Sequence, residues 1–244
     1  MIAGVSHDFC HDGFNNGYHV ARQTARFLEH GSDGVQEKYH FAESFKVIER
    51  AALLRNLSAE QAGLFRRRMC ECILATDMAR HMSDLNDLRA LVEQQGSSEN
   101  LLAPGVLDPG ERERRRTKLL ELTIHASDIS NLARPREAQE LQVYLLFEEF
   151  FNQGDLEAEA GLSVSFLCDR ATINVAKSCA NFGKFGPIPL FKIIGHFCPS
   201  KAYIAGRMEQ SAERWEQYAE NESEEHRQTY IKREGQAILN QTWV

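Results

Sequence analysis

The chain has 244 residues, of which 43% are hydrophobic and 26% charged, so it can bury a sizeable core and is neither fibrous nor disordered. Its net charge of −7 offers no broad basic surface, and we expect no nucleic-acid partner. No apolar run approaches the roughly 18 residues of a membrane span, and the N-terminus lacks a signal-peptide pattern. We expect a cytoplasmic protein whose 6 cysteines are reduced thiols, since they form no C-x-x-C pair.

The apolar periodicity is helical nearly throughout, and no alternating strand segment of useful length occurs. The fold class is therefore predicted to be all-α. The helices predicted for the first part of the chain are a buried one at residues 2–5, one over 37–54, and one that starts at the capping box of Ser58 and Gln61 and continues almost to Gly96.

The second part of the chain begins with a predicted surface loop at 96–110, which is rich in glycine and proline. A charge run at 111–116 then opens a helix. The remaining predictions are a helix that starts at Pro135, a loop around Gly161, a helix over 169–185 that Pro187 and Pro189 interrupt, a final amphipathic helix around Trp215, and a polar tail at 222–244.

Four clusters place metal-ligand side chains within otherwise apolar helices: His7-Asp8 with His11, Glu37 with His40, Thr76-Asp77 with His81, and His125 with Asp128. Each cluster alone is more often a satisfied polar pair, but together they can converge in one bundle, as in helical dimetal sites. Imidazole with carboxylate suits zinc, and carboxylate with water suits magnesium or manganese. Such a metal pair favours phosphoester hydrolysis. The motifs of P-loop, Rossmann, zincin and α/β-hydrolase proteins are absent, and a cysteine–histidine nucleophile stays open.

Six segments occur in a characteristic order: HDFCHDGFNN (7–16), EKYHFAESFKVIE (37–49), ILATDMARH (73–81), HASDISNLARP (125–135), EEFFNQGD (148–155) and LCDRATINVAKS (167–178). They resemble successive motifs of the class I cyclic-nucleotide phosphodiesterase catalytic domain. The resemblance implies a compact multi-helix, HD-like domain over 1–221 with a dimetal site between helices. The implied activity is hydrolysis of cAMP or cGMP to the 5′-monophosphate in cyclic-nucleotide signalling.

The resemblance also implies roles for individual residues. The metal ligands would be His7, Asp8 and Asp128, with Asp8 bridging zinc and a magnesium or manganese ion. The residues that hold metal-bound water would be His11, Glu37, Thr76 and Asp77. The nucleotide pocket would be lined by Asn131, Leu146, Phe150 and Phe182, with Phe182 stacked on the purine. The implied partner is a small cyclic nucleotide, and a homodimer is left open.

The sequence departs from the family pattern in ways that bear on activity. It does not contain the family's H-N-x-x-H motif, which supplies a zinc ligand and the histidine that protonates the departing 3′ oxygen. A chain without it is expected to lose about 10²- to 10⁴-fold in rate, so this chain alone is expected to be weakly active or inactive. Cys179 stands where the family has a purine-binding glutamine, Asp12 replaces a proline, and Cys10 replaces a common acid. The alternatives are a truncated or degenerate inert relative that binds a nucleotide or a protein, and a hydrolase of another phosphoester.

Overall fold

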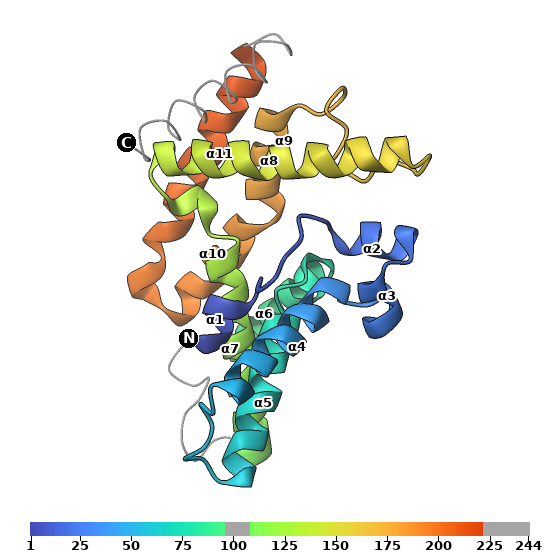
Figure 1. Cartoon of the computed structure of the whole chain (residues 1–244). Coiled ribbons are helices and arrows are strands. Elements are labelled where there is room, and N and C mark those ends of the chain that lie inside the picture. The colour runs from blue at the N-terminus through green and yellow to red at the C-terminus, as the bar shows by residue number, and fades with distance from the viewer. Residues whose placement is uncertain (96–107, 222–244) are drawn as a thin grey trace, which may run out of the picture. The chain divides into compact units, whose positions relative to one another are not determined.

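The computed structural model describes residues 1–95 and 108–221, and every regular element in these ranges is a helix (Figure 1), which confirms the all-α prediction. The chain forms two units, divided after Asp128. The first unit contains α1 (Ile2–Ser6), α2 (Asn16–Arg22), α3 (Ala25–His30), α4 (Val35–Arg50), α5 (Ala59–Leu74), the 3₁₀ turn η1 (Met78–Arg80), α6 (His81–Gln95) and α7 (Pro109–Asp128). None of the helices in the described ranges is long and apolar enough to cross a membrane.

The second unit contains η3 (Asn131–Ala133), α8 (Arg136–Glu159), α9 (Val175–Phe185), α10 (Pro187–Phe197), η4 (Pro199–Lys201) and α11 (Tyr203–Asn221). The predicted tail and most of the predicted loop at 96–110 lie outside the described residues. The range of 1–221 for one catalytic domain stays a prediction.

The core of the first unit is built between α4 and α5, which pack against each other. Phe45 and Ile48 of α4 meet Met69 and Ile73 of α5, all buried, with α1 packed against both helices. Burying each of these large side chains contributes about 1.5–3 kcal/mol to folding. The packing of α4 on α5 therefore forms the apolar core that supports the polar residues of the first unit.

Two helices of the first unit end earlier than the periodicity predicts. α4 ends at Arg50, not at 54, because Ala52 takes a left-handed φ of 51° and the N–H of Leu53 binds the carbonyl of Ile48, which closes a Schellman motif. The helix that begins at Ser58 has the predicted capping box, but it ends at Leu74 and does not reach Gly96.

The break after α5 follows from a local hydrogen bond. The carboxylate of Asp77 accepts from the N–H of Ala79 at 2.9 Å and caps η1, so the chain changes direction before α6 begins at His81. Apolar spacing alone does not show this break, since apolar residues continue on both sides of it. The turn places Thr76 and Asp77 outside a regular helix.

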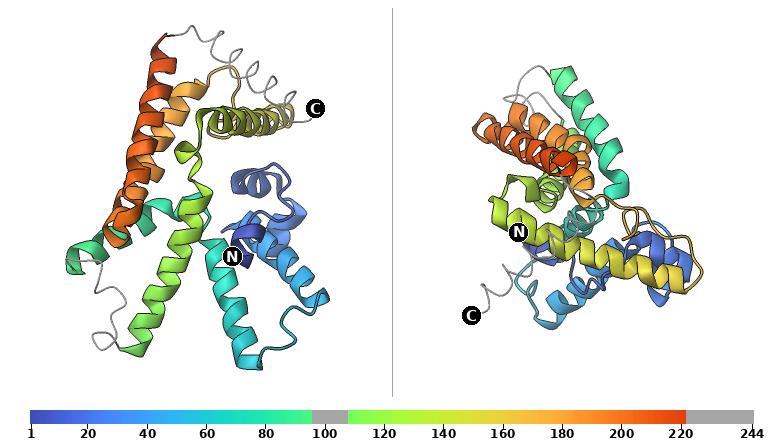
Figure 2. Two further views of the ribbon diagram at one scale, coloured as in Figure 1. Left: turned by 90° about the vertical axis from the view of Figure 1, so that its left-hand side faces the viewer. Right: turned by 90° about the horizontal axis from the view of Figure 1, so that it is seen from above.

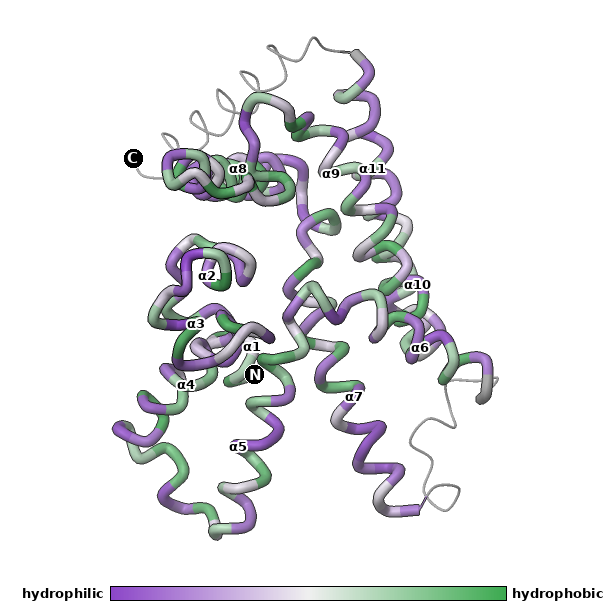
Figure 3. The backbone as a smooth tube through the Cα atoms, turned by 90° about the vertical axis from the view of Figure 1, so that its right-hand side faces the viewer, coloured by the Kyte–Doolittle hydropathy of each residue, from purple (hydrophilic) through white to green (hydrophobic). Residues whose placement is uncertain are grey.

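The two ends of the first unit are more solvated than its core. α1 forms as predicted but is not buried: Ile2 is 39% and Val5 82% exposed in the described structure. The first half of α7 is hydrophilic (Figure 3), and there Glu111 pairs with Arg114 and Arg115 on the helix surface. The charge run is only partly solvated, because the Arg115 side chain is 12% exposed and Glu113 pairs with Arg68 of α5. The helix begins two residues before the run.

The second unit corrects the predicted helix over 169–185. The Asp169 side chain binds the N–H of Ala171 and the hydroxyl of Thr172, which forms a turn, and α9 starts only at Val175 behind the cap residue Asn174. Pro187 does not merely interrupt a helix, because it is the first residue of α10, where a missing N–H costs nothing.

α9 and α11 run side by side (Figure 2) at very close range. A Cβ built on Gly183 of α9 would lie 2.6 Å from Cδ1 of Leu132 and 3.2 Å from Cβ of Ala212 of α11. The glycine is therefore needed for the close approach of the two helices. Trp215 and Met208 of α11 are almost completely buried in the same unit.

Candidate metal centre

Three of the predicted metal ligands come together in the first unit. His7 caps the C-terminal end of α1, Asp8 follows it, and Asp128 ends α7. Nε2 of His7 lies 3.0 Å from Oδ1 of Asp128 and 3.2 Å from Oδ2 of Asp8, and the ligand atoms of all three residues lie within 4.8 Å of one another. One imidazole and two carboxylates therefore face a common point.

The charges at this point strongly affect protonation. The hydrogen bonds of His7 to Asp128 and Asp8 raise its pKa to about 10, while the bond from His7 lowers the pKa of Asp8. Nδ1 of His7 lies 3.0 Å from the carbonyl of Gly4, to which it donates, so Nε2 is the nitrogen that faces the carboxylates. Without a metal, a proton on Nε2 is the positive charge that the two carboxylates share.

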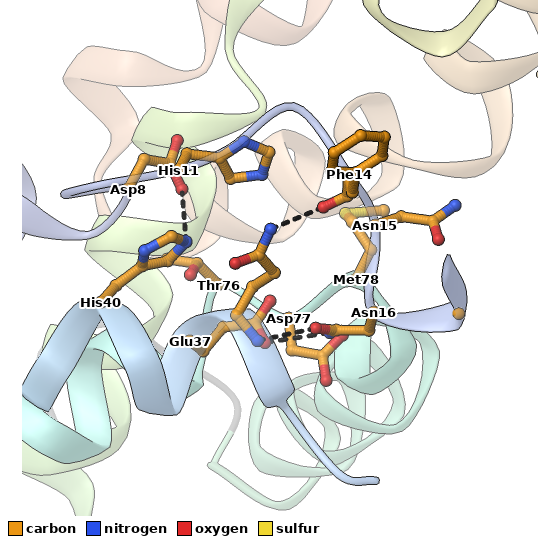
Figure 4. A pocket seen from close by; sticks show the side chains of 12 residues that line it. Asp8, His11, Phe14, Asn15, Asn16, Glu37, His40, Thr76, Asp77 and Met78 are labelled. Carbon is orange, nitrogen blue, oxygen red and sulfur yellow. Dashed lines mark hydrogen bonds and ion pairs between the residues drawn. The ribbon is translucent and has the colours of Figure 1, made fainter. Parts of the chain in front are cut away.

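A cavity of about 310 Å³ lies beside Asp8, and the side chains around it are shown in Figure 4. The other predicted catalytic residues line it: His11 from the loop after α1, Glu37 from α4, and Thr76 and Asp77 from the turn after α5. The structure thus brings together around one cavity residues from three separate motifs. An open, acidic cavity next to a histidine–carboxylate group can hold a polar, hydrated ligand.

Two histidines form part of the cavity wall. Nδ1 of His40 donates to the carbonyl of Phe9 at 2.7 Å, and burial lowers the pKa of His40, so its neutral ring turns Nε2 toward Asp8 at 4.0 Å. The His11 ring stacks on His40, with centroids 5.5 Å apart. Nδ1 of His11 accepts from the N–H of Gly13, which leaves Nε2 as the donor of a neutral His11 ring.

The acidic side of the cavity is held by short-range hydrogen bonds. Burial raises the pKa of Glu37, and the amide of Asn16 donates to its carboxylate at 3.0 Å. The hydroxyl of Thr76 donates to the carbonyl of Ile73 at 2.8 Å, which leaves its oxygen free to accept. With Asp77, these groups present acceptor atoms that can orient water.

The predicted nucleotide-pocket residues all belong to the second unit. Leu146 and Phe150 lie one turn apart on α8, and Leu146 is 41% exposed. On α9, Phe182 is 40% exposed, but Cys179 is buried, and burial raises the pKa of its thiol to about 12. Asn131 lies in η3, and its Oδ1 accepts no hydrogen bond within the described residues.

The donor set of the first unit fits a divalent metal. Imidazole nitrogen and carboxylate oxygen are the donors that zinc binds, and the carboxylates of Asp8 and Asp128 with nearby acceptors suit magnesium or manganese. The three ligand residues are partly exposed: the exposed fraction of the side chain is 19% for His7, 31% for Asp128 and 61% for Asp8. An ion can therefore reach them.

Sequence reasoning gave no role to two residues that hold the site. His40 was recognised only as a neighbour of Glu37, although its ring lies beside Asp8 and binds the Phe9 carbonyl. Gln36 was missed: it is 3% exposed and donates to the Phe14 carbonyl at 2.6 Å. No pattern in the sequence marks Gln36, because its burial and its partners on other elements arise only in the tertiary fold.

Residues 1–207 match the protein family described as 3′5′-cyclic nucleotide phosphodiesterase. The chain is 34% identical over 194 residues to a probable 3′,5′-cyclic-AMP phosphodiesterase pde-4 of Caenorhabditis elegans and, over the same length, to 3′,5′-cyclic-AMP phosphodiesterase 4C of Mus musculus. Each alignment covers 79% of this chain and 28% of the relative, so the chain spans less than a third of those proteins. The crystal structure of the phosphodiesterase domain of Salpingoeca rosetta rhodopsin phosphodiesterase matches with a TM-score of 0.79 and 25% identity, covering 90% of this chain and 65% of that one.

Proposed function

The chain belongs to the 3′,5′-cyclic nucleotide phosphodiesterase family, and from this premise we propose that it carries the metal-binding part of a cyclic-nucleotide hydrolase. The proposed reaction opens the 3′,5′-cyclic phosphate of cAMP or cGMP to the 5′-monophosphate, in signalling in the cytoplasm. The observation that carries the proposal is the convergence of His7, Asp8 and Asp128 beside the acidic cavity.

The proposed cofactors are zinc and magnesium, with manganese as a substitute for magnesium. His7, Asp8 and Asp128 would hold them. When bound, such ions polarise the phosphoryl oxygens and activate water for attack.

The chain's own side chains orient the reactants. Glu37 and Asp77 accept hydrogen bonds from water, and the Thr76 oxygen adds a neutral acceptor. His11 offers its Nε2–H toward a negatively charged group in the cavity, because its Nδ1 is engaged by Gly13. Positioned donors and acceptors of this kind stabilise charge that develops on a phosphate.

The proposed purine site lies in the second unit, on η3, α8 and α9. The exposed ring of Phe182 offers a stacking surface, and the buried Oδ1 of Asn131 accepts from an exocyclic amine. Cys179 is a poor hydrogen-bond partner for a base edge, since its buried thiol stays protonated. We therefore propose weak discrimination between adenine and guanine.

The test is release of 5′-AMP and 5′-GMP with Mg²⁺ and Zn²⁺, measured for this chain and for the chain extended at its N-terminus by a segment that carries the H-N-x-x-H motif. Asp128→Ala is expected to abolish Zn²⁺ binding and turnover while the far-ultraviolet circular dichroism stays helical. The matched control is Asp87→Ala, which removes an exposed carboxylate of α6. Retained Zn²⁺ binding in Asp128→Ala would remove Asp128 from the site, and no turnover by either chain would contradict the enzymatic function.

A second candidate function is binding of a cyclic nucleotide, or of a partner protein, without turnover. The buried thiol at Cys179 favours it, because a site selected for rapid turnover of one purine needs a side chain that binds the base edge. Calorimetry with cAMP and cGMP separates the two functions. Binding by the extended chain without release of 5′-nucleotide supports the inert module.

A further inference from the structure

A polar cluster outside the metal centre holds the loop that carries His11. It consists of Asp12, His19, Arg26 and Gln36, and we call it the Asp12 cluster. We propose that Asp12 is a positioning residue, which fixes the loop at 10–16 against α2, α3 and α4 so that Asp8 and His11 keep their orientation toward the cavity. This inference rests on the proposed function, because it assigns Asp12 to the same site.

The carboxylate of Asp12 receives donors from three separate elements. Oδ1 lies 2.8 Å from Nε2 of Gln36 on α4, 3.2 Å from Nη1 of Arg26 on α3, and 3.3 Å from Nε2 of His19 on α2. Gln36 and His19 are 3% and 2% exposed, and the Arg26 side chain is 16% exposed. One carboxylate thus contacts three polar side chains that are largely buried and lie on three different helices.

The other ring nitrogen of His19 contacts the N-terminal cap of α3. Nδ1 lies 2.8 Å from the hydroxyl oxygen of Thr24, which also accepts from the N–H of Phe27. Burial lowers the pKa of His19 and so favours its neutral ring, whose Nε2 faces Asp12. Of the three contacts of Asp12, the one with Gln36 is a hydrogen bond in which the Gln36 amide donates to the carboxylate.

The cluster attaches the loop at alternate residues. Arg26 donates to the carbonyl of Cys10 at 3.0 Å as well as to Asp12, and Gln36 donates to the carbonyl of Phe14 at 2.6 Å. The N–H of Gln36 also donates to Oδ1 of Asn16. Asp12 is therefore one of four attachment points between Cys10 and Asn16, and it is the one that contacts three different helices.

The loop needs such attachment because its own backbone has no regular hydrogen bonding. Cys10 and Gly13 have φ values of 62° and 83°, in the left-handed region, and the segment between α1 and α2 contains no helix. Asp12 directly follows His11, and Gln36 directly precedes Glu37. The bond between Asp12 and Gln36 consequently ties together the neighbours of two cavity side chains.

The guanidinium of Arg26 is itself held in place. It lies 3.9 Å from the ring centroid of Tyr39 on α4 and donates to Oε1 of Gln36. A stacked, hydrogen-bonded arginine loses little further freedom when it binds a carboxylate. The cluster is thus preorganised to bind a carboxylate at position 12, where the phosphodiesterase family has a proline.

The test compares Asp12→Asn with Asp33→Asn, which removes an exposed carboxylate from the turn between α3 and α4. The first readout is amide hydrogen exchange over residues 8–17, with peptides of α5 as an internal reference. Asp12→Asn is expected to speed exchange in 8–17 about tenfold and to leave α5 unchanged. Equal exchange in the wild type and Asp12→Asn would overturn the proposal.

The second readout is the affinity for Zn²⁺ alone, measured by calorimetry with the midpoint of urea unfolding recorded beside it. Positioning predicts that Asp12→Asn weakens Zn²⁺ binding about tenfold with little change in the midpoint, whereas Asp33→Asn changes neither. A lowered midpoint with unchanged Zn²⁺ affinity would show a purely structural role and overturn the proposal. If the wild type binds no Zn²⁺, the proposed function fails, and the exchange readout still decides the role of Asp12.

Arg26→Gln offers an independent check on the same contacts. The single variants Asp12→Asn and Arg26→Gln are each expected to speed exchange in 8–17, and the double variant by less than the product of the two factors, because both weaken the ion pair between Asp12 and Arg26. Fully multiplied effects in the double variant would show that the two residues act separately and would contradict the cluster.

Discussion

Nε2 of His7 lies 3.0 Å from Oδ1 of Asp128, although the two residues are 121 positions apart in the sequence. This contact joins the end of α1 to the end of α7 within one unit, and Asp8 completes it on the other side of the imidazole. Protonation of His7 therefore stabilises the metal-free fold but opposes metal binding, since a proton and a metal compete for the same nitrogen.

The metal-free chain is expected to lose stability as the pH rises. The folded-state pKa of His7 is raised from 6.5 to about 10. The contribution of His7 to the free energy of unfolding is therefore complete below pH 6.5, declines as the pH rises, and is gone above about pH 10. Urea unfolding with a chelator should therefore show His7→Gln less stable than the wild type at pH 6 and equal to it near pH 10.5. The control is His196→Gln, at an exposed histidine of α10, and a difference between wild type and His7→Gln that does not shrink with pH would contradict the raised pKa.

Metal binding should show the opposite pH dependence. A metal takes the lone pair of Nε2, so His7 must release its proton, and between pH 6.5 and 9 the Zn²⁺ affinity is expected to rise about tenfold per pH unit. Calorimetry at pH 7.5 in buffers of different ionisation enthalpy should report about one proton released per Zn²⁺. Heats that do not depend on the buffer would show that His7 is not a ligand.

Local features of the sequence predicted much of the fold because they act over a few residues. The capping box of Ser58, the helix start behind Pro135 and the free thiols all follow from short-range chemistry. The periodicity failed at the turn before η1 and at the start of α9, where the side chains of Asp77 and Asp169 bind nearby N–H groups and compete with the helix. Apolar spacing carries no information about such bonds.

The site was predictable to the extent that its residues lie in short motifs. His7 with Asp8, and Thr76 with Asp77, are adjacent in sequence, and the grouping of Asp8, Thr76 and Asp77 around one cavity with His7 beside Asp8 could be inferred from ligand chemistry. The role of Gln36 could not, because its partners come from other elements and a buried amide has no periodic signature. Polar contacts between distant elements are specified by the tertiary fold.

The cysteines should differ strongly in reactivity. Cys10 is exposed, whereas burial raises the pKa of Cys168 to about 11 and that of Cys179 to about 12. Because the thiolate is the nucleophile, a disulfide reagent at pH 8 is expected to modify Cys10 at least about 100 times faster than Cys179 in the folded chain. Mass spectrometry of quenched samples measures the order of modification. Cys10→Ser should remove the fast phase, and early modification of Cys179 would show that its part of α9 opens readily.

Two glycines of the second unit should respond to alanine in opposite directions. Alanine has the higher helix propensity by about 1 kcal/mol, so Gly206→Ala, where a Cβ meets nothing within 4 Å, should stabilise α11 by up to about that amount. At Gly183 the new Cβ would lie 2.6 Å from the buried Leu132, and overpacking of about 1–3 kcal/mol should exceed the gain. Urea unfolding followed by circular dichroism measures both variants. If Gly183→Ala were as stable as Gly206→Ala, the side chain of Leu132 in η3 could not lie so close to α9.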